Sequence, residues 1–267
     1  MIFGFTTLSM SSFMKRGRLS HQRKINNMIY GIIGDIHSNG DALTAILDAM
    51  RQEHVDSVLC VGDIVGYAAE PGACIDLIRE SASAVVAGNH DYAVVGKFPV
   101  NYFNADAKSA VLWTAERLSK GALDYLRDLP LTERLPDVTL VHGSLCRPEF
   151  FDYITTIAAA GLAFDLLDTP VCFYGHTHVP LGILMADGKI SVNTGNEYDL
   201  SKAEKALINV GSVGQPRDWD VRASYALYDT EKKIVKIHRV KYNIHNAAEK
   251  IYSAGLPKFN ALRLTGR

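Results

Sequence analysis

The chain has 267 residues, of which 48% are hydrophobic and 21% are charged, a composition typical of a globular protein with a sizeable core. Its 28 basic and 29 acidic residues leave a formal net charge of −1, which argues against binding of nucleic acids or membrane surfaces by bulk charge. Four cysteines, none in a C-x-x-C pair, argue against a disulfide scaffold, and no apolar run approaches the ~18 residues of a membrane span. We expect a cytoplasmic protein of a reducing compartment.

Residues 1–27 differ from the rest of the chain. They carry five basic residues and no acidic one, and the basic residues follow the apolar stretch, whereas a secretory signal places them before it. Two interpretations stay open: an organellar targeting segment, or a start codon assigned upstream of the native one, because Met28 directly precedes the first predicted strand. In both cases we expect residues 1–27 to lie outside the fold and residues 28–267 to form one domain.

The first part of this domain alternates short apolar runs, typical of buried strands, with patterns of helical period. Strands are predicted over 29–33, 55–61 and 84–87. Helices are predicted after Asn39, which can cap the first one, and over 73–79. Strands less than ~30 residues apart that are bridged by helices are typical of the βαβ units of a parallel sheet.

Residues 104–129 are predicted as one helix that ends before Pro130. Seven more strands are predicted, over 139–141, 171–174, 182–185, 190–193, 206–210, 225–228 and 234–240. Gly, Asn and Asp turn residues separate the last five, as in antiparallel hairpins. A parallel first half followed by a hairpin-rich second half favours an α/β fold of the four-layer αββα type, with two packed β-sheets flanked by helices.

Side chains that bind metals stand at the end of almost every predicted core strand. They occur in the segments GDIH, GD, GNHD, HG and GHTH, which contribute Asp35, His37, Asp63, Asn89, His90, Asp91, His142, His176 and His178. The carboxyl ends of strands in an open α/β sheet meet at one edge, so these side chains should converge. Imidazole with carboxylate favours Mn, Fe, Zn, Co or Ni over Ca. More ligands are present than one four-coordinate zinc uses, which favours two divalent ions with a bridging carboxylate.

The ordered set of five segments resembles the calcineurin-like metallophosphoesterase superfamily, and most closely its small bacterial phosphoesterases related to dinucleoside tetraphosphatases. The segment Asn209–Asp229 is similar to the closing segment of those enzymes. The resemblance implies two β-sheets between helix layers and a two-metal site. Its implied ligands are Asp35, His37 and His178 for the first ion, Asp63 as the bridge, and Asn89, His142 and His176 for the second. His90 matches the histidine that assists the leaving group without binding metal.

One departure from the superfamily bears on the substrate. Its Ser/Thr protein phosphatases carry a GDxVDRG segment, whereas this chain reads GDIVGY, with Gly66 and Tyr67 in place of the carboxylate and the phosphate-binding arginine. Loss of the arginine removes a bidentate contact with phosphate, and loss of the carboxylate removes a group that orients His90. Arg217 is our candidate for a contact with the substrate phosphate.

We therefore predict a metal-dependent phosphoesterase in which a hydroxide between two ions attacks phosphorus, with phosphodiester or nucleotide-type substrates favoured. Protein phosphatase and dinucleoside tetraphosphatase activities are alternatives within the enzyme class. A non-catalytic, metal-binding interaction scaffold is the alternative from another class, and the presence of His90 disfavours it. We expect a small phosphoester as the partner, with no stable binding of nucleic acid and no membrane association. The sequence does not indicate an oligomeric state.

Overall fold

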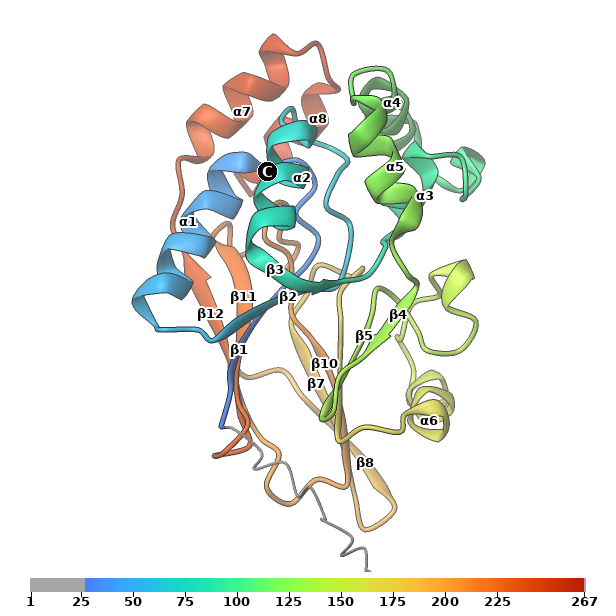
Figure 1. The fold of residues 1–267 in the computed structure, drawn as a ribbon, viewed down its shortest axis with the longest axis vertical. Helices are drawn as coiled ribbons and strands as arrows, with labels where there is room; N and C mark the ends of the chain where they lie inside the picture. Colours follow the sequence, from blue (N-terminus) through green and yellow to red (C-terminus); the bar gives the residue numbers. More distant parts are fainter. Residues whose placement is uncertain (1–26, 267) are drawn as a thin grey trace, which may run out of the picture.

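Two six-stranded sheets form the centre of the computed structural model, which describes residues 27–266 (Figure 1). The strands of the first sheet are β1 (Ile29–Ile33), β2 (Ser57–Cys60), β3 (Ala82–Val85), β9 (Glu197–Asp199), β11 (Ala223–Asp229) and β12 (Ile234–Val240). Those of the second are β4 (Thr132–Arg134), β5 (Val138–Val141), β6 (Val171–Tyr174), β7 (Leu181–Ala186), β8 (Lys189–Asn193) and β10 (Lys205–Asn209). Their orders are β3-β2-β1-β11-β12-β9 and β4-β5-β6-β10-β7-β8.

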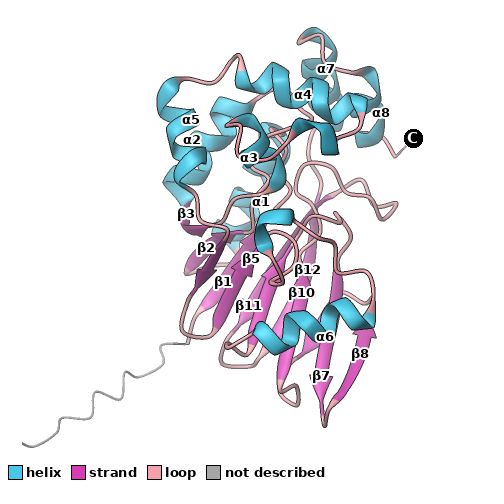
Figure 2. Cartoon of the chain, turned by 90° about the vertical axis from the view of Figure 1, so that its right-hand side faces the viewer, coloured by secondary structure: helices cyan, strands magenta, loops and turns pink. Residues whose placement is uncertain are grey.

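Helices lie on the outer faces of the two sheets and at one end of the sandwich (Figures 1 and 2). They are α1 (Gly40–Gln52), α2 (Pro71–Ser81), α3 (Asn89–Val94), α4 (Ala105–Ala115), α5 (Lys120–Asp128), α6 (Ile157–Leu166), α7 (Ile244–Ser253) and α8 (Lys258–Leu264). Helix α1 contacts β11 and β12 of the first sheet, whereas α6 contacts β10 of the second and lies along its outer face in Figure 2. None of the helices within residues 27–266 has the length and apolar character needed to cross a membrane.

The alternation of side chains along the strands produces the layers. Ile32 belongs to a buried cluster between the two sheets, together with Phe173 and Tyr228, whereas its neighbour Ile33 packs on the opposite face against α1. A third buried cluster, which includes Tyr174, fills the space between the second sheet and α6. The predicted four-layer αββα sandwich is therefore confirmed.

Each sheet combines strands from both parts of the chain. In the first sheet β11 pairs antiparallel with β1, with Ala226 opposite Ile32, and β1 pairs parallel with β2. In the second sheet β10 pairs parallel with β6 and antiparallel with β7. The helix predicted over 104–129 is two helices, because the Ser119 side chain accepts a hydrogen bond from the Ala122 amide and begins α5 as a new helix. Asn39 caps α1 as predicted, accepting from the Ala42 amide.

Parallel pairing fixes the position of the functional loops. β1, β2 and β3 run parallel in the first sheet, and β5, β6 and β10 run parallel in the second. Their carboxyl ends therefore meet at one end of the sandwich, the end above which α2–α5, α7 and α8 gather in Figures 1 and 2.

Candidate metal centre

The predicted ligands converge at this end of the sandwich. All seven, and His90 with them, are at most 8% exposed. Three groups of side chains present potential ligand atoms within 4.8 Å of one another: Asp35–His37–His178, His37–Asp63–His90 and Asp63–His142–His176. These groups comprise imidazole and carboxylate side chains alone. The amide oxygen of Asn89 is buried at the same end and has no hydrogen-bond partner among the described residues. Asp91 instead accepts hydrogen bonds from the backbone amides of Gly88 and Val65.

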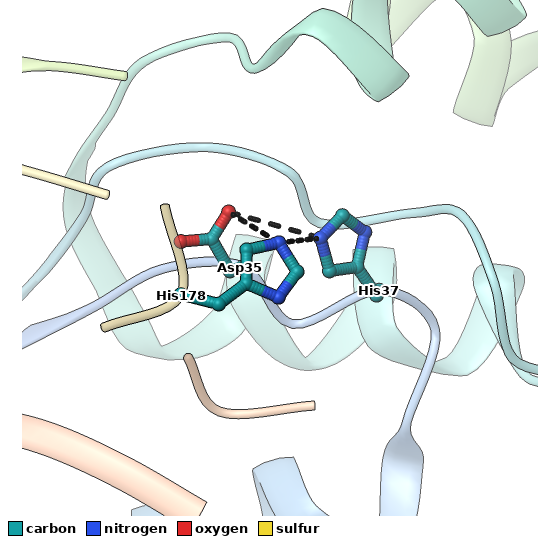
Figure 3. Close-up of side chains that lie close together, drawn as sticks. All are labelled: Asp35, His37 and His178. Atoms are coloured by element: carbon teal, nitrogen blue, oxygen red, sulfur yellow. Dashed lines mark hydrogen bonds and ion pairs between the residues drawn. The ribbon is translucent and has the colours of Figure 1, made fainter. Parts of the chain in front are cut away.

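The first group brings three ligand atoms around one point (Figure 3). His37 Nε2 lies 3.0 Å from His178 Nε2, and Asp35 Oδ1 lies 3.7 Å from the former and 3.5 Å from the latter. Ligand bonds of about 2.1 Å place two ligands of one ion roughly 3.0–3.4 Å apart. The observed separations are close to that range.

Hydrogen bonds at the far side of each ring identify the nitrogen that faces the centre. Nδ1 of three histidines lies at a backbone carbonyl oxygen: His37 at Val65 (3.2 Å), His142 at Val61 (2.8 Å) and His178 at Gln215 (2.6 Å). A carbonyl only accepts, so Nδ1 carries a proton in each of these rings. In the neutral rings of His37 and His178, the lone pair of Nε2 therefore points into the centre. Between His37 and His178, two lone pairs thus face each other at 3.0 Å. Such an arrangement is repulsive unless a proton or a metal cation lies between them, and burial of both rings disfavours protonation by lowering their pKa values.

Asp63 belongs to two of the three groups. Its Oδ2 is 3.5 Å from His37 Nε2 and 3.2 Å from His142 Nε2, whereas its Oδ1 accepts a hydrogen bond from the His90 amide at 2.8 Å. The backbone amide of His90 therefore holds one carboxylate oxygen, and the other oxygen faces both His37 and His142. This is the position that a carboxylate shared by two ions would occupy.

Unsatisfied atoms test whether metal ions fit this site. Asp35 Oδ1 and His142 Nε2 are buried without a hydrogen-bond partner within residues 27–266, as is the Asn89 oxygen. A buried polar atom without a partner costs about 1–3 kcal/mol. The other Asp35 oxygen accepts from the His176 amide at 2.8 Å, so only the atom facing the centre lacks a partner. The donor set, carboxylate and amide oxygens with neutral imidazoles, fits divalent transition metals.

Three of the four proposed histidine ligands are neutral at pH 7. Burial lowers the pKa values of His37, His176 and His178 well below the usual range, which keeps their lone pairs available at neutral pH. Burial would raise the pKa of Asp63, but the charge of His142 outweighs it and holds that pKa far below its usual value. Burial would lower the pKa of His142, but Asp63 in turn raises that pKa to about 9. Asp63 is therefore a buried anion. Burial raises the pKa of Asp35 to about 7, as expected for a carboxyl group that needs a positive partner.

Five of the seven predicted ligands have left-handed backbone conformations. Their φ angles are 50° (Asp35), 50° (His37), 54° (Asp63), 69° (His176) and 63° (His178). Each such non-glycine residue costs roughly 1–3 kcal/mol, and strain of this kind concentrates at functional sites. The neighbouring glycines have another role, because a Cβ at Gly88 would lie 2.0 Å from Asp63 Oδ1 and one at Gly175 would lie 2.6 Å from Asp35 Oδ2. These glycines let the backbone approach the carboxylates.

His90 stands at the edge of the centre. Its ring meets the His37 ring edge-on, with centroids 4.6 Å apart, and contacts Tyr67 and Phe103 at 4.7 Å each. Its Nδ1 is buried without a hydrogen-bond partner in the described part of the chain, and a Cβ at Gly66 would lie 2.5 Å from it. Gly66, which stands where the protein phosphatases have a carboxylate, thus presents only backbone atoms to the His90 ring. Burial lowers the pKa of His90 to about 4, so its ring is neutral at pH 7.

A cavity opens above these residues, lined in part by Asp63, His90, His176 and His178. Arg217 also lines it, as expected of a phosphate contact, and donates from Nη2 to the Tyr67 hydroxyl at 3.2 Å and to Gln215 Oε1 at 3.0 Å.

Sequence reasoning missed other lining residues: Tyr102, Phe103, Tyr153, Gln215 and Arg263. Tyr153 stacks on the His176 ring with centroids 4.0 Å apart, yet nothing in the local sequence connects the two. A pattern of aromatic residues over 98–103 and 150–153 was the available signal.

Comparisons with known proteins show the family and the fold of the chain. The profile of the calcineurin-like phosphoesterase superfamily domain matches residues 28–233. A protein of Methanocaldococcus jannaschii is 38% identical over 249 residues, which are 90% of this chain and 98% of the relative. The crystal structure of a metallophosphoesterase from Sphaerobacter thermophilus is 39% identical, with a TM-score of 0.79 over 90% of this chain and 99% of that one. A protein from Pyrococcus horikoshii, 20% identical, shares the fold, with a TM-score of 0.71 over 88% of this chain and 97% of its own.

Proposed function

Since the chain belongs to the calcineurin-like phosphoesterase superfamily and is a phosphoester hydrolase, we propose that it acts with two divalent metal ions on phosphodiester or nucleotide-type substrates. The observation that carries this proposal is the pair of Nε2 lone pairs of His37 and His178, which face each other at 3.0 Å inside the protein. A cation is the species that stabilises such a pair, and the Asp63 oxygen between the two histidine groups supports a second ion.

The proposed ligands follow the grouping in space. Asp35, His37 and His178 would hold one ion, Asp63 would be shared, and Asn89, His142 and His176 would hold the other. When bound, two such ions supply a hydroxide nucleophile near neutral pH and neutralise charge on the phosphoryl oxygens. The carbonyl groups behind the imidazoles hold the rings in the required tautomer and orientation.

We assign His90 to the leaving group. The ring is confined by Gly66, Tyr67 and Phe103 and lines the cavity, so its position is fixed before substrate binds. A neutral imidazole carries one N–H, which can donate to the departing oxygen and transfer its proton as negative charge develops there. His90 also lies within ligand distance of His37 and Asp63. An experiment must therefore separate a role in protonation of the leaving group from a role in metal binding.

The surroundings favour substrates with an aromatic group. A second cavity shares Asn89, Tyr153 and His176 with the first, and aromatic side chains form most of its wall: Phe98, Tyr102, Phe103, Phe150, Phe151 and Tyr153. Tyr102 is 76% exposed and Phe150 is 52% exposed, an arrangement that offers faces for stacking. A nucleobase or aryl group attached to the reacting phosphate would fit this wall.

Metal dependence is the first test. Protein stripped with a chelator and shown to be metal-free should be inactive toward bis(p-nitrophenyl) phosphate, p-nitrophenyl phosphate and dinucleotides, and Mn²⁺ or Co²⁺ should restore activity. Full turnover by verified metal-free protein would refute the proposal. A fully metal-loaded protein that hydrolysed no member of the panel would favour a non-catalytic scaffold instead.

The role of His90 is tested by varying the leaving group. His90→Ala should keep its metal content and lose more activity on an alkyl or nucleoside leaving group than on p-nitrophenolate, by roughly 10-fold, because a stable anion needs little protonation. His245→Ala, which removes an exposed histidine of α7, is the matched control. Loss of bound metal from His90→Ala would make His90 a ligand.

A further inference from the structure

Two arginines from distant parts of the chain line the cavity above the metal centre. Arg217 follows β10, and Arg263 lies in α8, beyond the residues that match the superfamily profile. Neither guanidinium forms an ion pair with any carboxylate within residues 27–266. Asp106 lines the same cavity but pairs with neither of them. Both positive charges thus face one space without a direct ion pair, although Asp63 and Asp106 line the same cavity.

Arg217 is held in place through part of its guanidinium. Nη2 donates to Tyr67 and Gln215, and the guanidinium carbon lies 5.7 Å from the centre of the Tyr67 ring. Nε is buried and has no hydrogen-bond partner in the described part of the chain. A buried donor of this kind costs free energy unless a ligand accepts from it.

A hydrogen bond of Asn260, one helical turn before Arg263, fixes the position of α8. Asn260 is 1% exposed and donates from Nδ2 to the Tyr67 carbonyl oxygen at 3.1 Å, which fastens α8 to the segment that carries Asp63. The Arg263 guanidinium lies 5.0 Å from the centre of the Phe259 ring. Burial, together with the positive charge of Arg217, lowers the pKa of Arg263, as expected for two cations that sense each other.

The same two arginines also line an outer cavity, beside Trp219, which is 95% exposed. They therefore stand at the junction between the cavity of the metal centre and open surface. A phosphate at this junction would balance both charges while a separate phosphoryl group occupied the metal centre.

We propose that Arg263 and Arg217 form a phosphate-binding subsite, and that the physiological ester carries a second phosphate outside the bond that is hydrolysed. This proposal rests on the proposed function of the metal centre. It makes Arg263 a specificity residue that the C-terminal helix adds to the superfamily domain.

Direct binding tests the subsite without catalysis. Metal-free protein, dialysed free of chelator, is titrated calorimetrically with pyrophosphate. Arg263→Gln should weaken the binding of pyrophosphate roughly 10-fold to 100-fold. Arg263→Lys keeps the charge but lacks the planar guanidinium, so its affinity should lie between those of Arg263→Gln and the wild type. Lys258→Gln removes the same charge from an exposed position of the same helix, lines neither cavity and should bind like the wild type. Equal affinities of Arg263→Gln, Arg263→Lys and Lys258→Gln would overturn the proposal.

Turnover supplies the second measurement. Thymidine 5′-(p-nitrophenyl phosphate) is compared with the same ester bearing a 3′-phosphate, using Mn²⁺-loaded protein. The ratio of kcat/KM for the ester with the 3′-phosphate to kcat/KM for the ester without it should fall about 10-fold in Arg263→Gln. The same ratio should stay constant in Lys258→Gln. An unchanged ratio in Arg263→Gln would refute the subsite while leaving the proposed hydrolysis intact. Absence of hydrolysis by every variant, with a calorimetric difference retained, would refute the proposed function and leave the subsite.

Discussion

Replacement of one glycine should disable the centre without removing any proposed ligand. Gly66 has a φ angle of +121°, a backbone conformation that residues other than glycine rarely adopt. A Cβ there would lie 2.5 Å from His90 Nδ1 and 3.0 Å from His37 Nδ1, whereas ordinary van der Waals contact begins at 3.4 Å. Gly66→Ala must therefore strain the backbone and displace both rings.

The magnitude follows from these distances. The His90 ring must move by about 0.9 Å, and a misplacement of about 1 Å typically costs ~10²-fold in rate. The unfavourable backbone conformation adds roughly 1–3 kcal/mol of destabilisation. For a domain of this size, about 2–4 °C per kcal/mol predicts a fall in Tm of roughly 2–12 °C.

Gly161→Ala is the matched control, because this glycine lies in α6 with nothing within 4 Å of its prospective Cβ. It should stabilise the protein by about 0.4–1 kcal/mol and leave turnover unchanged. Steady-state kinetics with an aromatic diester, metal analysis and thermal unfolding are measured on both variants. A Gly66→Ala protein with the turnover and Tm of the wild type would show that His90 is not confined by this segment.

Three further predictions concern the bridge, the tail and the core. Asp63→Asn should lose bound metal and turnover, because a neutral amide oxygen binds cations weakly, whereas Asp165→Asn, at an exposed carboxylate of α6, should keep both in metal analysis and kinetics. A chain that begins at Met28 should match the full chain in Tm and kcat, since β1 begins at Ile29; residues 1–26 lie outside the described part, and a large loss of either quantity would contradict the prediction. Tyr198→Phe should raise Tm by roughly 2–4 °C, because the Tyr198 hydroxyl is buried between the sheets without a partner among residues 27–266 and removing it gains about 1 kcal/mol; a fall in Tm would indicate a bound water at that position.

The convergence of the strand-end residues could be predicted because parallel strands direct their carboxyl ends to one edge. Asp35, Asp63 and His176 are far apart in the chain, yet each follows an apolar run that is recognisable as a buried strand. The left-handed conformations of these residues were not predictable, since local propensity opposes them and only tertiary contacts hold them.

Other differences also have tertiary causes. The apolar positions between 104 and 129 continue through the gap between α4 and α5, so hydrophobic period alone could not locate the break made by Ser119. Strand β9 has three residues at a sheet edge, too short for a periodic pattern. Arg263 lies in a short C-terminal helix, and its place in the cavity depends on the Asn260 anchor.

The antiparallel pairing of β1 with β11 has a consequence for the order in which the chain folds. The Asp35 carbonyl accepts from Ser212 Oγ at 2.8 Å and from the Gly214 amide at 2.9 Å, and the Gly34 carbonyl accepts from the Val213 amide at 3.0 Å. The loop that follows β1 is thus completed by residues synthesised almost 180 positions later. Such distant contacts require a large loop to close before they stabilise anything, which slows folding. On the ribosome the N-terminal βαβ units must therefore wait, with one edge of β1 unpaired, and we expect metal capture to be a late event of biogenesis.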